Sequence, residues 1–167
     1  GWELSKLGCE VAARASANMV FSSVQGGMMG ALGIGLPDVP IFLAAVFKTL
    51  FEISLSFGYP YDTKQEQTYQ MLLICAAVGE EAERKQAAVD ANIVAQQIRM
   101  GAGICSVSFE EAKQRASKAL CSAALMGKMV QGAPIIGVYG GFRNGVLLKQ
   151  IGTVAAVKYQ QRMLRER

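Results

Sequence analysis

The sequence contains no histidine among its 167 residues, and this absence removes several classes of enzyme. Serine and cysteine hydrolases use a histidine as general base, and HExxH zinc proteases use two histidines as metal ligands. A catalytic role would have to rest on carboxylate, lysine, tyrosine or cysteine side chains alone. We therefore assign no catalytic residue, no metal and no cofactor from the sequence, and we favour a non-enzymatic role.

Paired cysteine motifs are also missing. The four cysteines form no CxxC pair, and their spacings match no zinc ribbon. Each stands among apolar or small residues, where a buried reduced thiol is the default. This pattern predicts a protein of the reducing cytoplasm. The cysteines are Cys9, Cys75, Cys105 and Cys121.

Charged residues make up only 18% of the chain and hydrophobic residues 51%. Charged residues usually form about a quarter of a globular domain, so we expect an ample core and some apolar surface left for a partner or a bilayer. The net charge of +4 is too small, without a basic patch, to indicate nucleic-acid binding.

The sequence has no uninterrupted apolar run that could span a membrane. Its most apolar stretches are broken by two prolines, by Lys48 and Glu52, and by Arg143 and Lys149. A charge at the centre of a bilayer costs about 2.5–3.5 kcal/mol on insertion scales. These stretches therefore fit buried helices better than transmembrane spans, although a short hairpin insertion at the proline segment stays an alternative.

The apolar periodicity indicates helices throughout, and strand alternation persists nowhere. Thr63 with Glu66 and Ser108 with Glu111 have the spacing of capping boxes. We expect an all-α, compact single-domain bundle of five to six helices over residues 1–167. Because the chain starts inside a predicted helix, we also expect further residues before it. The predicted helices cover residues 3–29, 41–57, 64–78, 80–99, 108–130 and 136–165.

A glycine- and proline-rich turn, GLPDVP at residues 35–40, precedes the second predicted helix. Each proline disfavours a helical conformation in the residue before it, so Leu36 and Val39 should be extended. Asp38 would then lie at or beside the N-cap, where backbone N–H groups and the helix dipole favour a carboxylate. Asp38 is either a cap in a rigid linker or part of a polar cluster.

Lys48 and Glu52 lie four residues apart on one face of the second predicted helix, among apolar residues. They form either an exposed or half-buried salt bridge, or, with Asp38, a charged cluster that binds a polar ligand.

The last predicted helix contains a GxxxGxxxG stripe at Gly137, Gly141 and Gly145. Such a stripe allows another backbone to approach closely. It predicts either an intramolecular contact, for example with the glycines of residues 26–35, or a homodimer.

The C-terminal stretch is basic and partly amphipathic. Its cations either belong to a solvated helix end, where they suit the dipole, or contact anionic lipid headgroups. The residues that would make this membrane contact are Arg143, Lys149, Lys158, Arg162 and Arg165.

Taken together, two groups of motifs resemble the signature of the EcsC family. The first is GLPDVP at residues 35–40, followed by Lys48, Glu52, Ser54 and the FGY of residues 57–59; the second comprises Gly132, Pro134, Ile135, Ile136, Gly137 and Asn144, with Tyr159 and Arg162 after it. The resemblance runs from about Gly8 to the end. It departs from the family pattern in having Lys48 where arginine is frequent, which would weaken a bidentate anion contact, and in a short N-terminal part.

This resemblance implies a bacterial, mostly helical protein of a family named for a gene beside an ABC transporter linked to secretion. It implies no catalytic residues. We expect a membrane-peripheral accessory module at the inner face of the cell membrane, whose partners are lipid or an ABC transporter component. The alternative is a ligand-binding or hydrolytic domain that uses the Asp38 and Glu52 carboxylates. The expected ligand-binding residues are Asp38, Lys48, Glu52 and Asn144.

Overall fold

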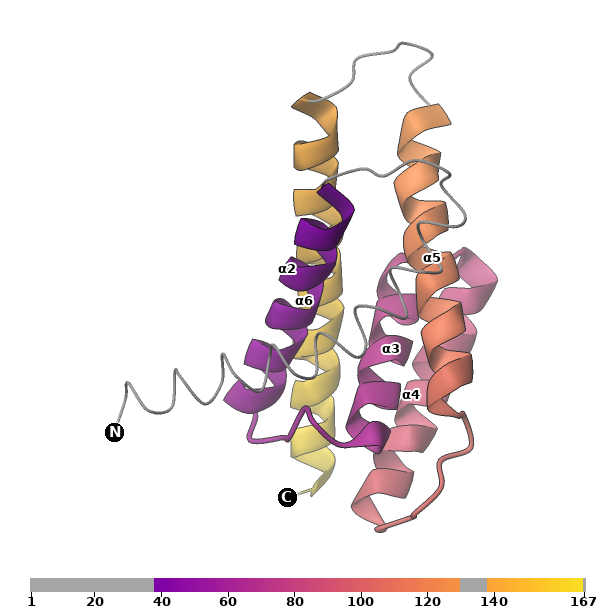
Figure 1. The fold of residues 1–167 in the computed structure, drawn as a ribbon. Helices are drawn as coiled ribbons and strands as arrows, with labels where there is room; N and C mark the ends of the chain where they lie inside the picture. The colour runs from indigo at the N-terminus through magenta and orange to yellow at the C-terminus, as the bar shows by residue number, and fades with distance from the viewer. Residues whose placement is uncertain (1–37, 130–137, 167) are drawn as a thin grey trace, which may run out of the picture.

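The computed structural model describes residues 38–129 and 138–166, and every regular element within these ranges is an α-helix (Figure 1). Helices α2, α4 and α6 run in one direction along the bundle, and α3 and α5 run in the other. The all-α prediction is confirmed, while the predicted helix at residues 3–29 lies outside the described residues. The helices are α2 (Asp38–Ser56), α3 (Lys64–Val78), α4 (Glu81–Arg99), α5 (Phe109–Met129) and α6 (Val138–Glu166).

Local signals set most helix boundaries. Thr63 Oγ1 accepts a hydrogen bond from the Glu66 N–H at 3.2 Å, and Ser108 Oγ accepts one from the Glu111 N–H at 3.2 Å. Gly58, which follows α2, has φ of +83°, a conformation that favours glycine. Both predicted N-terminal caps are therefore confirmed, and α2 ends within one residue of its predicted end at residue 57.

The start of α2 was predicted wrongly. The helix begins at Asp38, so Val39 is helical and not extended. Pro40 is tolerated there because the first N–H groups of a helix have no acceptor within it, so a missing N–H costs nothing. The bias against a helical residue before proline is overridden within this first turn.

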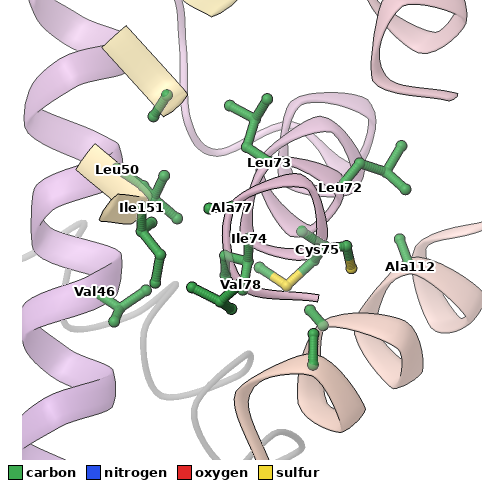
Figure 2. Close-up of a cluster of buried hydrophobic side chains, with 14 of the residues drawn as sticks. Val46, Leu50, Leu72, Leu73, Ile74, Cys75, Ala77, Val78, Ala112 and Ile151 are labelled. Carbon is green, nitrogen blue, oxygen red and sulfur yellow. The ribbon is translucent and has the colours of Figure 1, made fainter. Parts of the chain in front are cut away.

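Helix α3 lies at the centre of the bundle and is buried on nearly all sides. In Figure 2 its Leu73 and Ala77 lie toward Leu50 of α2 and Ile151 of α6, and its Cys75 lies toward α5. From Met71 to Val78 this helix is apolar on all sides, as is typical of a core helix, and burial of each large side chain contributes about 1.5–3 kcal/mol. Helices α4, α5 and α6 pack directly on α3, while α2 packs mainly on α6.

Helices α2 and α6 pack closely at Gly152. A Cβ atom at this position would lie 3.3 Å from Thr49 Cγ2 and 3.9 Å from Ile53 Cδ1. By contrast, α4 and α6 pack mainly against α3, and polar side chains bridge the space between them. This space forms a hollow.

Candidate functional site: a basic groove between α4 and α6

A groove of about 480 Å³ separates α4 from α6. Its walls carry apolar and basic side chains, which is the mixture expected for an amphipathic anionic ligand. The residues that matter for its chemistry are Val89, Ile93 and Arg99 of α4 and Lys158, Arg162 and Arg165 of α6.

Hydrogen bonds at two places join the α4 and α6 walls of the groove. Lys158 Nζ donates to the Ala88 carbonyl at 3.2 Å and to Asn92 Oδ1 at 3.0 Å. Toward the helix ends, Arg99 Nη1 donates to the Arg165 carbonyl at 3.2 Å. The C-terminal turns of the two helices therefore lie side by side, with their cations at the negative ends of both helix dipoles.

The inner wall of the groove contains a buried ion pair. Arg162 Nη1 donates to both carboxylate oxygens of Glu66, at 2.9 and 2.8 Å, and the Tyr159 hydroxyl donates to Glu66 Oε1 at 2.7 Å. Glu66 is 0% exposed and Arg162 6%. Burial raises the pKa of the Glu66 carboxyl, and the Arg162 charge opposes that rise.

Arg162 has further partners on its solvent side. Its Nε donates to Glu166 Oε1 at 3.1 Å, and the Tyr59 hydroxyl donates to Glu166 Oε2 at 2.7 Å. The guanidinium lies 4.1 Å from the centroid of the Tyr59 ring and 5.3 Å from that of Tyr69. The charge of Arg162 is therefore already balanced by two carboxylates and two aromatic faces.

The other three cations of the groove are not balanced in this way. Within residues 38–129 and 138–166, Arg99, Lys158 and Arg165 form no salt bridge with a carboxylate. Burial lowers the pKa of Lys158, and the positive charge of Arg165 lowers it further. The groove therefore has an excess of positive charge.

Exposed apolar side chains gather at the end of the bundle where α4 and α6 finish. Met100 is 69% exposed, Ile104 in the loop before α5 is 88% exposed, and Leu164 of α6 is 60% exposed. Arg99 and Arg165 lie beside them in the chain. We call this surface, made by Arg99, Met100, Ile104, Leu164 and Arg165, the basic-apolar end.

The basic residues predicted for membrane contact differ in their surroundings. Lys158 and Arg165 line the groove, while Lys149 is exposed farther up α6. Arg162 is buried in its ion pair, so it does not present a charge at the surface. The side chain of Arg143 lies outside the described part of the structure.

Two of the predicted ligand-binding residues, Lys48 and Glu52, lie outside the groove. Lys48 Nζ and Glu52 Oε1 are 3.8 Å apart, with side chains 75% and 64% exposed, so they form the exposed salt bridge of the two alternatives. Neither lines the groove. The side chains of Asp38 and Asn144, as well as Gly137, lie outside the described residues, so the grouping of the four predicted residues stays a prediction.

Sequence reasoning missed Glu66 and Arg99. Glu66 has the spacing of a capping-box acid, but its carboxylate contacts Arg162 and Tyr159 instead. A usable signal was present, since an acid at the start of a helix that is otherwise buried requires a cationic partner. Arg99 resembled an ordinary cation of a last helical turn.

The described residues contain neither a cluster of metal ligands nor a membrane-spanning helix. In the described ranges, no group of three or more acidic or cysteine side chains is placed to hold a metal ion. Among the same residues, no helix is long and apolar enough to cross a membrane.

Comparisons with known proteins give one match. The model of the EcsC protein family matches residues 1–164. No curated protein and no solved structure matches the chain.

Proposed function

This chain belongs to the EcsC protein family, and we propose that it is a peripheral membrane module, accessory to transport or secretion, that contacts anionic lipid through its basic-apolar end. The observation that carries this proposal is the pairing of unbalanced cations with exposed apolar side chains at one end of the bundle. An ABC transporter component at the same membrane is the protein partner that we propose.

Electrostatics supports this orientation. Arg99 and Arg165 have no acidic partner among the described residues, so approach to a negative surface need not break a salt bridge. Each basic residue near an anionic leaflet contributes about 1 kcal/mol. This attraction falls with salt, because the Debye length is about 10 Å at 0.1 M ionic strength.

The exposed apolar residues add a second, salt-resistant contribution. Met100 and Ile104 are more exposed than the other large hydrophobic residues of the described chain. Their loop includes Gly101, with φ of +70°, and is tied to the bundle by the bond from the Ser106 N–H to Gln97 Oε1 at 2.9 Å. A loop held in this way can place both side chains at the headgroup boundary without reorganisation of the helices.

Co-sedimentation with vesicles tests the proposal. The wild-type protein should bind vesicles that contain phosphatidylglycerol, bind neutral vesicles weakly, and lose most binding at high salt. Substitution of both Arg99→Gln and Arg165→Gln should weaken binding about thirtyfold, since each charge contributes about 1 kcal/mol. Substitution of both Met100→Ser and Ile104→Ser should abolish the binding that remains at high salt.

Lys85→Gln is the matched control. Lys85 is an exposed cation near the start of α4, 2.6 Å from Glu81, and far along the helix from the basic-apolar end. Its substitution should leave vesicle binding unchanged. Absence of binding to every vesicle, or an equal loss in the control variant, would contradict the proposal.

A further inference from the structure

We infer that the groove between α4 and α6 is a specific site for the phosphate monoester headgroup of an acidic lipid, held between Lys158 and Arg165. This inference rests on the proposed membrane function and assigns a ligand chemistry to one part of it. The groove volume of about 480 Å³ is within the range of ligand pockets, about 300–1,000 Å³.

Lys158 is the first reason to expect an anion. It is half-buried, and its ammonium group donates to two neutral oxygens, those of Ala88 and Asn92, while it forms no salt bridge with any residue that the structure describes. Lys158 lies about two turns before the end of α6, beyond the last turn in which the helix dipole favours a cation. A half-buried cation without a counter-charge is costly, and an anion in the groove would offset that cost.

Arg165 supplies the second cation. Arg165 lies about two turns after Lys158 on the same helix, so both cations are on the α6 wall of the groove, and the charge of Arg165 contributes to the lowered pKa of Lys158. Arg162 does not compete for the anion, because Glu66 and Glu166 already occupy it. A phosphate monoester carries a charge of about −1.5 to −2 at neutral pH and therefore matches two cations, whereas a phosphodiester carries a single negative charge.

The apolar wall favours a lipid over a free phosphate compound. Val89 is 53% exposed and Ile93 is 42% exposed on the α4 side of the groove. A small phosphate ion would leave these side chains in water. The glycerol and upper acyl region of a lipid would cover them, and the groove reaches Arg99 and Arg165 of the basic-apolar end.

The test compares two kinds of vesicle with matched surface charge, one containing phosphatidic acid, a monoester, and the other phosphatidylglycerol, a diester. Wild-type protein should bind the phosphatidic acid vesicles about tenfold more tightly, the gain expected from one additional charge-assisted hydrogen bond. Lys158→Gln should remove this preference and leave phosphatidylglycerol binding unchanged. Lys158→Arg should retain it, and Lys85→Gln should have no effect.

The outcomes separate the two proposals. Equal binding to both vesicles by the wild-type protein would overturn the monoester site and leave the membrane module standing. Absence of binding to either vesicle would reject the membrane function. Glycerol phosphate is the soluble probe: if it binds in a Lys158-dependent way while phosphatidic acid vesicles do not, the lipid assignment is wrong. Arg165→Gln is a second test variant. Because Arg165 is exposed, its substitution should not impair folding, and it should also remove the preference for phosphatidic acid.

Discussion

Arg162 of α6 contacts both carboxylate oxygens of Glu66 on α3 through a single nitrogen, at 2.9 and 2.8 Å, although the residues are 96 positions apart in the chain. Because both side chains are buried, this ion pair fixes how α6 lies on the central helix. It also forms the inner wall of the groove, so the fold and the candidate site depend on the same contact.

Loss of one partner of this pair should be more damaging than loss of both. Arg162→Met would leave the Glu66 carboxylate buried without a counter-charge, and we expect it to lower the free energy of unfolding by about 3–5 kcal/mol. The double variant Arg162→Met with Glu66→Leu should recover much of this loss. Urea unfolding followed by circular dichroism measures both effects. Strictly additive losses in the two single variants would contradict the expectation.

The exposed pair Lys48–Glu52 provides the control for that cycle. Its ionic groups are 3.8 Å apart and largely in water, so its contribution should be below about 1 kcal/mol. Lys48→Met and Glu52→Leu should therefore show little coupling under the same conditions.

Tyr59 should make stability depend on pH in the alkaline range. Burial, together with the hydrogen bond to Glu166, raises the pKa of Tyr59 to about 12 from an ordinary value of 10.0. The folded state keeps a proton that the unfolded state releases, so this stability is present below pH 10 and is lost as the pH rises from 10 through 12.

Urea unfolding across this pH range tests the effect in Tyr59→Phe. The variant should lose stability less steeply than the wild type, while the buried Tyr69 and Tyr159, whose pKa values are also raised by burial, keep part of the slope in both proteins. Parallel curves for the two proteins would show that Tyr59 does not contribute.

Two glycines of α6 should respond to substitution in opposite ways. A Cβ atom at Gly145 would meet nothing within 4 Å, so Gly145→Ala should raise the free energy of unfolding by up to about 1 kcal/mol through helix propensity. At Gly152 a larger side chain would press on Thr49, and Gly152→Leu should cost about 1–3 kcal/mol.

The Gly145→Ala variant also tests the predicted homodimer. If two chains pack through Gly137, Gly141 and Gly145, an alanine at position 145 should weaken their association. Analytical ultracentrifugation of wild-type and Gly145→Ala protein gives the answer. A monomer at all concentrations would rule out the homodimer.

Helix boundaries were largely predictable because the signals that set them are local. The α3 helix matches its predicted range of residues 64–78, since Thr63 caps it and Gly79 ends it. The start of α2 was missed because proline is excluded from helix interiors but tolerated in the first turn. Likewise, the Lys48–Glu52 contact follows from helical spacing alone.

The candidate site was only partly predictable. Its basic residues on α6 stand out in the sequence as a charge cluster. What the sequence could not distinguish was Arg162, which is neutralised, from Lys158 and Arg165, which are not. That distinction depends on Glu66, whose position opposite Arg162 is set by tertiary packing and leaves no local pattern.

The central position of α3 has a consequence for how the molecule opens. Since α4 and α6 each pack on α3 and are joined to each other by the hydrogen bonds of Lys158 and Arg99, the groove can widen when these bonds break, while the hydrophobic core keeps α3 covered. Backbone amides of α3 should then exchange with solvent deuterium only through global unfolding, while those at the C-terminal turns of α4 and α6 exchange through small local openings. Entry of a ligand into the groove would thus leave the most protected helix undisturbed.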